Sequence, residues 1–75
     1  TIQFNVTKDS WVSLAIYDLR GRKVNTLASG NFQQGTYAID WNGKNSFGNQ
    51  VASGVYFYHL NGIGDYKKGK LLFLK

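Results

Sequence analysis

The sequence contains no cysteine, no proline and no methionine, and its acidic residues are four aspartates without a glutamate. The absence of cysteine excludes disulfides and thiolate metal sites, so the fold must depend on its hydrophobic core. No apolar run approaches the roughly 20 residues of a membrane-spanning helix, and no segment has the pattern of a signal peptide. Because methionine is absent and Thr1 already begins a strand-like pattern, we expect a processed or excised piece of a longer protein.

The residues that are present can build one small core. The chain has 75 residues, of which 43% are hydrophobic and 16% aromatic, which is far from the composition of a disordered protein. Nine Lys and Arg residues against four Asp give a net charge of +5, which raises nucleic acid as a partner. The charges are dispersed and no groove-reading element is evident, so we predict a solvated surface and no nucleic-acid partner.

Alternation of apolar and polar residues is the main structural signal, because a strand with one buried face has period two. Residues 2–6 and 11–17 alternate in this way, with Val12, Leu14 and Ile16 facing inward in the second segment. Residues 11–28 are predicted to form a hairpin around the turn 18–22, with a bulge or an early strand end between Val24 and Leu27.

Further along the chain, residues 28–35 are predicted to be a loop anchored by Phe32, and residues 36–41 a fourth strand. In the fifth strand, residues 55–60, we expect Val55 and Phe57 in the core and Tyr56 and Tyr58 on the other face. The last strand covers residues 66–75. No segment has helical periodicity, so six strands in a single domain indicate a sandwich or barrel.

Four sequence blocks, in order, resemble one family of bacterial β-sandwich modules. Residues 16–24 resemble the family's "IYD..G..V" hairpin, residues 35–43 its "G.Y...WDG", residues 48–58 its "G....SGVYFY", and residues 67–75 its terminal "K....L.K". That family includes the C-terminal sorting domains of the type IX secretion pathway and the immunoglobulin-like domain of the flagellar hook-capping protein. The loop after Trp41 departs from it, having Asn42 and Asn45 where the family usually has acidic residues.

The resemblance implies an all-β fold, namely a small immunoglobulin-like antiparallel β-sandwich of six to seven strands covering residues 1–75. It also implies a non-catalytic C-terminal module of a larger protein, secreted or on the cell surface and exported through the periplasm. The family residues that carry this structural expectation are Tyr17, Asp18, Gly21, Val24, Gly35, Tyr37, Trp41, Gly43, Gly48, Gly54, Val55 and Tyr56.

The main functional expectation is a sorting module that directs an upstream cargo through an outer-membrane export machine. Its terminal strand would be captured by main-chain pairing, with lysines fixing the register. The residues assigned to this role are Lys67, Lys68, Lys70, Leu71, Leu72, Phe73, Leu74 and Lys75. The alternative is a structural self-assembly module in which exposed strand edges pair with neighbouring copies to build a fibre or a cap.

The sequence offers little for catalysis or metal binding. His59 is the only histidine, and the four aspartates lie in or beside different turns. The loop 42–49 lacks carboxylates for calcium. We therefore predict no catalytic residues, no cofactor and no metal. A further alternative is a carbohydrate-binding module of an extracellular hydrolase, with Trp11, Tyr56 and Tyr58 as a stacking platform.

Overall fold

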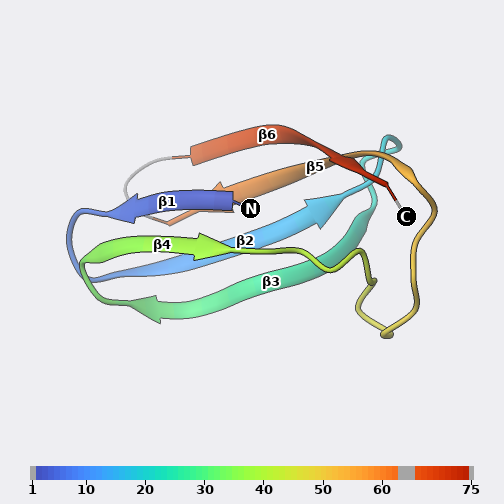
Figure 1. Ribbon diagram of the computed structural model, residues 1–75. Coiled ribbons are helices and arrows are strands. Elements are labelled where there is room, and N and C mark those ends of the chain that lie inside the picture. Colours follow the sequence, from blue (N-terminus) through green and yellow to red (C-terminus); the bar gives the residue numbers. More distant parts are fainter. Residues whose placement is uncertain (1, 63–65, 75) are drawn as a thin grey trace.

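The computed structural model describes residues 2–62 and 66–74, and these form six β-strands in two antiparallel sheets without a helix (Figure 1). A two-stranded sheet has the order β1-β4, and a four-stranded sheet has the order β3-β2-β5-β6. The strands are β1 (Ile2–Val6), β2 (Ser10–Tyr17), β3 (Lys23–Phe32), β4 (Gly35–Ile39), β5 (Gly54–Asn61) and β6 (Tyr66–Phe73). The all-β prediction is confirmed.

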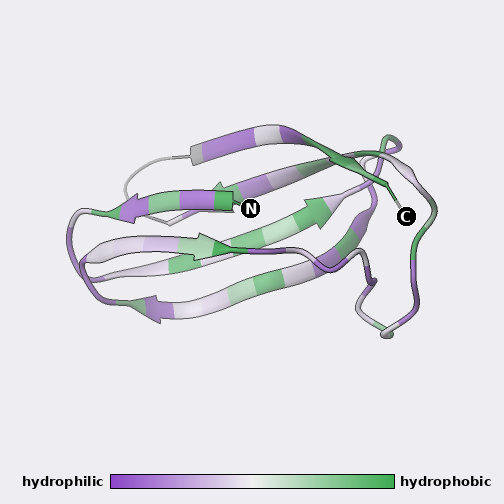
Figure 2. Cartoon of the chain, in the orientation of Figure 1, coloured by the Kyte–Doolittle hydropathy of each residue, from purple (hydrophilic) through white to green (hydrophobic). Residues whose placement is uncertain are grey.

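The core lies between the two sheets. Alternation along β1 buries one face of that strand, and Figure 2 shows the alternation directly. β2 lies inside the four-stranded sheet and contributes the most completely buried side chains. The buried residues of the core cluster are Ile2, Phe4, Val6, Val12, Leu14, Ile16, Tyr56 and Leu60, as predicted for the first two strands.

The hairpin of β2 and β3 contains the predicted irregularity, and it occurs twice. The register shifts between Leu14 and Ala15 and again between Ile16 and Tyr17. In β3 these shifts leave Leu27 and Val24 without a directly opposed residue, so both residues that interrupted the alternation are bulged. Each bulge inserts one residue and increases the local twist of the strand.

The predicted loop at residues 28–35 is wrong, because β3 continues as far as Phe32. This part of the strand pairs with Ser10 to Leu14 of β2, which supplies hydrogen bonds that its small and polar residues need. Ala28, Gly30 and Phe32 are half-buried, whereas Ser29 and Asn31 are exposed. The alternation is therefore real, but glycine, serine and asparagine made the sequence resemble a loop.

The predicted orientation of β5 is also wrong. Tyr56 is only 8% exposed and Leu60 is buried, and Tyr58 packs against the same core. Val55 and Phe57 lie on the outer face of the four-stranded sheet instead. Pairing with β2 decides the orientation, since Leu60 lies opposite Leu14 and must share its inward face.

Candidate interaction surface

The turn between β2 and β3 is built around Asp18. The Asp18 N–H donates to the carbonyl of Arg22, and the Gly21 N–H donates to the carbonyl of Asp18, both at 3.0 Å. The Asp18 carboxylate accepts the backbone N–H groups of Arg20 at 2.9 Å and of Arg22 at 3.0 Å. Gly21 takes a positive φ of 81°, which glycine adopts without a steric penalty. The family residues Asp18 and Gly21 therefore close one tight turn.

The turn at residues 45–49 repeats this arrangement with an amide in place of the carboxylate. The Asn45 N–H donates to the Asn49 carbonyl at 2.9 Å, and the Gly48 N–H donates to the Asn45 carbonyl at 3.0 Å. The Asn45 side-chain oxygen accepts the N–H groups of Phe47 and Asn49, both at 3.0 Å. Gly48 has a φ of 82°. Asn45 thus replaces the expected acidic residue without any loss of turn geometry.

The Asp18 carboxylate is stabilised in its charged form. The N–H of Arg22, with a smaller contribution from that of Arg20, holds the pKa of Asp18 below its ordinary value of 3.8. The guanidinium Nε of Arg22 lies 3.2 Å from Oδ2 and acts in the same direction. These contacts compensate the negative charge of Asp18 within its own turn.

This pKa predicts how stability depends on pH. A carboxyl whose pKa is lowered by folding stabilises the protein above its unfolded-state pKa, and this contribution is lost as the pH falls through the folded-state pKa. We expect Asp18→Asn to retain the turn, as Asn45 does, and to lose less stability than the wild type between about pH 5 and about pH 2. Urea unfolding across this range measures the difference. Identical pH profiles for the two proteins would contradict the prediction.

The family residues Trp41 and Gly43 connect the loop after β4 to the last strand. The Trp41 ring packs 5.0 Å from Tyr56 and 5.3 Å from Phe73, centroid to centroid. Its indole N–H donates to the Lys44 carbonyl at 2.9 Å. Gly43 is buried and has a φ of 78°, and a Cβ at this position would overlap the Phe73 ring. The end of β6 is thereby fixed in the core.

The remaining family residues have structural surroundings. Gly35 begins β4 opposite Val6, and the Tyr37 hydroxyl donates to the Gln33 carbonyl at 2.7 Å. The Tyr56 hydroxyl donates to the Ala52 carbonyl at 2.7 Å, so this ring is buried with its polar end satisfied. Tyr17 lies at the end of β2, and Val24 lies in the first bulge of β3. Gly54 and Val55 begin β5.

The residues assigned to sorting between Lys67 and Phe73 lie on β6, one of the two edge strands of the four-stranded sheet, and Leu74 follows that strand. Its N-terminal half is basic and its C-terminal half is apolar, as Figure 2 shows. Leu71 and Phe73 pack against the core, whereas Leu72 is 68% exposed and Leu74 is also exposed. Lys67, Lys68 and Lys70 are exposed, and Lys75 lies outside the described residues. The predicted edge strand therefore presents lysines and alternate leucines to solvent.

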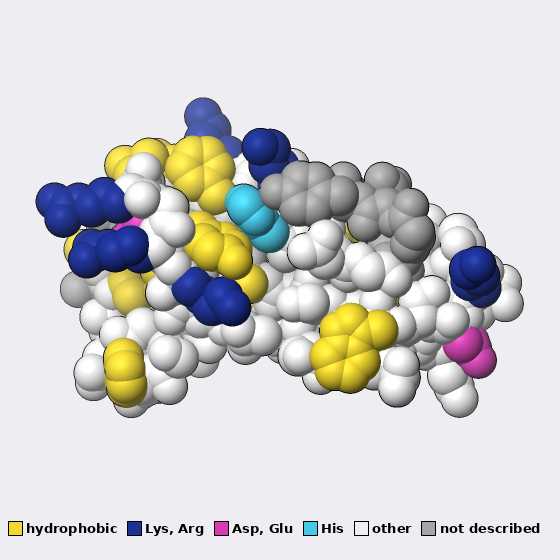
Figure 3. All heavy atoms as spheres, turned by 180° about the vertical axis from the view of Figure 1, so that it is seen from behind, with side chains coloured by type: hydrophobic (Ala, Val, Ile, Leu, Met, Phe, Trp, Pro, Cys, Tyr) yellow, Lys and Arg dark blue, Asp and Glu magenta, His cyan; other side chains and the backbone are white. Residues whose placement is uncertain are grey.

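Exposed apolar side chains are concentrated at one end of the sandwich. Five large hydrophobic residues are exposed among those described, and four of them are near the ends of β2 and β6 or in the loop between β4 and β5. These four are Leu19, Phe47, Leu72 and Leu74. Leu19 and Phe47 are carried by the two equivalent turns. Figure 3 shows apolar side chains and the basic residues around them at this end. Such clustering is typical of an interaction site.

The aromatic platform proposed for carbohydrate binding does not form. Trp11 is 56% exposed, but Tyr56 is buried and Tyr58 packs against the core. The register places Tyr58 opposite Ile16, on the inward face. Trp11 alternates with the inward Val12 and so lies on the outer face. The three rings cannot bind one sugar surface.

Within residues 2–62 and 66–74, no three His, Cys, Asp or Glu side chains lie close enough together to hold a metal ion. The His59 ring lies 4.5 Å from that of Tyr17. The Asp9 carboxylate accepts the Gln34 N–H at 2.9 Å. In the same part of the chain, no helix is long and apolar enough to cross a membrane.

The two antiparallel sheets and the core between them form a small β-sandwich. Residues 1–65 match the model of the FlgD Ig-like domain, so the chain belongs to that family. The family is structural and non-catalytic, in agreement with the prediction that the chain is not an enzyme. The flagellar half of the predicted resemblance is confirmed. Neither a curated protein nor a solved structure matches the chain.

The family match does not support the sorting hypothesis. The matched family is the flagellar one, and the match ends before β6, the strand on which sorting depends. Sequence reasoning also missed the equivalence of the two turns. The signal was present, because both five-residue segments begin with an Asx residue and have glycine at the fourth position.

Proposed function

We propose that this chain is a structural assembly module in which β6 of one copy pairs with β6 of a neighbouring copy. Membership of the FlgD Ig-like domain family supports a structural role, and flagellar hook-capping proteins are exported, which supports a secreted or cell-surface location. The observation that carries the proposal is the exposed edge of β6 with Leu72 projecting from it. An edge strand offers unpaired backbone groups to another strand.

The sequence of β6 favours one pairing register. An antiparallel pair centred on Leu72 places Leu72 against its counterpart and Lys70 against Leu74. In this register the lysines are not opposed to one another, so the repulsion that usually protects a lysine-bearing edge is avoided. The apolar half of the strand would form the contact, and Lys67 and Lys68 would extend beyond it.

A cysteine at position 72 tests this register directly, since the chain contains no other cysteine. Directly opposed residues have Cα atoms about 4.5 to 5.5 Å apart, within the range of a disulfide. We expect Leu72→Cys to form a covalent dimer under mild oxidation. Lys68→Cys is the control, because it lies on the same face but is not opposed to position 68 of the other copy in this register. Equal cross-linking of both variants, or a wild type that sediments as a monomer at its highest soluble concentration, would contradict the proposal.

Sorting remains a second proposal, favoured by the exposure of Lys67, Lys68 and Lys70 on the same edge. The upstream cargo that it requires is likewise a prediction. Deleting the strand would be a poor test, because Leu71 and Phe73 stabilise the core. Reversing the three lysines to glutamate leaves the core residues in place and should abolish secretion of a fused cargo. Undiminished secretion would contradict sorting.

A further inference from the structure

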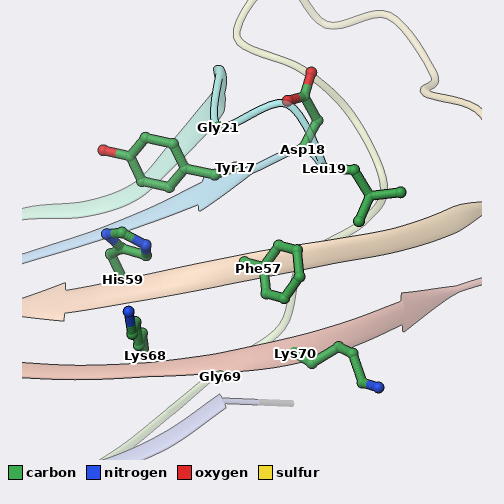
Figure 4. A pocket seen from close by; sticks show the side chains of 9 residues that line it. All are labelled: Tyr17, Asp18, Leu19, Gly21, Phe57, His59, Lys68, Gly69 and Lys70. Carbon is green, nitrogen blue, oxygen red and sulfur yellow. The ribbon is translucent and has the colours of Figure 1, made fainter.

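A groove of about 490 Å³ lies on the outer face of the four-stranded sheet, away from the core. Its floor is formed by Phe57 and His59 of β5 (Figure 4). Tyr17 and Leu19 form one wall, and Lys68 and Lys70 of β6 form the other. The register explains this arrangement, because Tyr17, Phe57 and Lys70 occupy one row across three adjacent strands.

The floor and one wall of the groove are largely apolar. Phe57 is half-buried, and Leu19 is 70% exposed at the tip of its turn. No described residue covers the groove. The core lies on the other face of the sheet, so packing of the sandwich does not explain the apolar side chains here. An apolar hollow beside a few polar groups is the usual form of a binding site.

The other wall gives the groove its charge. Lys68 and Lys70 are exposed, and the single carboxylate among the described lining residues is Asp18, whose charge is compensated by Arg22 and by backbone N–H groups. Among the described residues, no carboxylate pairs with these two lysines, so the groove presents positive charge beside a largely apolar floor. A second copy of this chain carries the same net charge of +5, and a neutral sugar offers no charge complementarity. Both fit less well than an acidic partner.

We infer that the groove binds an extended segment of another protein with an acidic–apolar–acidic pattern. Successive side chains of an extended segment point to opposite sides. Acidic residues at positions i and i+2, about 7 Å apart, match the spacing of Lys68 and Lys70 along β6. The apolar residue between them is then directed toward Leu19 and Tyr17. This inference does not depend on pairing between copies, because Leu72 does not line the groove.

The test uses the full 75-residue chain and a displayed library of random heptapeptides. We expect the selected peptides to be enriched in the acidic–apolar–acidic pattern. A labelled Gly-Ser-Glu-Phe-Glu-Ser-Gly peptide should bind and should shift the NMR amide signals of Tyr17, Phe57, Lys68 and Lys70. The matched peptides with lysine in place of glutamate, or serine in place of phenylalanine, should bind at least about tenfold more weakly.

Matched variants of the protein separate the groove from general electrostatics. Lys68→Glu with Lys70→Glu should weaken peptide binding about tenfold or more, and Leu19→Ser about fivefold. Lys8→Glu with Lys44→Glu changes the net charge equally, and Trp11→Ser removes an exposed apolar side chain of the same face. None of these three control residues lines the groove, so their binding should be unchanged.

Three outcomes would overturn the inference. The first is a selected library without acidic enrichment. The second is equal weakening by the groove variants and the controls. The third is a neutral oligosaccharide, such as cellohexaose, that shifts the groove amides when the acidic peptides do not. None of these outcomes affects the cysteine test at Leu72, so failure here is distinguishable from failure of the assembly proposal.

Discussion

Replacing Leu14 with alanine is expected to lower the free energy of unfolding by about 3 kcal/mol. Leu14 lies on β2, inside the four-stranded sheet, and its side chain is completely buried against the two-stranded sheet. The truncation removes apolar contacts and leaves a cavity that neighbours from both sheets can fill only in part. A chain of 75 residues without a disulfide has a small total free energy of unfolding, so this loss should bring the protein close to global unfolding. Urea denaturation followed by tryptophan fluorescence measures it.

Leu72→Ala is the matched control for this experiment. It removes the same side chain from a position that is largely exposed on β6. At concentrations where the chain is monomeric, its effect should stay within about 0.5 kcal/mol, as is usual for surface substitutions. If both variants lost similar stability, Leu14 would not occupy the central position in the core that the fold gives it.

Substituting Gly43 with alanine is expected to lower the free energy of unfolding by about 3 kcal/mol through two separate effects. The first is the positive φ of 78°, which an L-residue adopts at a cost of about 1 to 2 kcal/mol. The second is the overlap of the new Cβ with the Phe73 ring, which packs against Trp41 and cannot move away freely. Overpacking of this kind typically costs about 1 to 3 kcal/mol.

Gly48→Ala isolates the first effect. Gly48 has almost the same backbone conformation, with a φ of 82°, but a Cβ there meets no atom within 4 Å. We expect it to cost only about 1 to 2 kcal/mol. NMR signals from Leu71 to Phe73 should change in Gly43→Ala and stay in place in Gly48→Ala. Equal destabilisation by the two substitutions would show that contact with Phe73 contributes nothing.

The sequence predicted strands well where polar residues mark the outer face. In β1, Gln3 and Asn5 separate the apolar residues, so the buried face is unambiguous. In β5, Val55 to Leu60 have apolar or aromatic character at nearly every position, so alternation cannot identify the inner face. That face is decided by pairing with β2, which is a long-range property that one strand's sequence does not contain.

The interaction surface was predictable only in part. The position of β6 at an edge followed from its order in the chain and its lysine content. The groove did not, because its walls come from the β2–β3 turn and from β6, which are about 50 residues apart in sequence. They meet only because β5 pairs with both β2 and β6. A composite surface of this kind depends on strand order rather than on any local motif.

The anchoring of Phe73 beneath Gly43 means that the limit of sequence similarity is not the limit of the folding unit. The family match ends at residue 65, yet β6 supplies Leu71 and Phe73 to the core and covers one side of β5. A fragment trimmed to residues 1–65 would leave Tyr56 and Tyr58 uncovered and would turn β5 into a new, largely apolar edge. Such an edge invites aggregation. The unit to express, crystallise or graft onto another protein is therefore the chain with its last strand included.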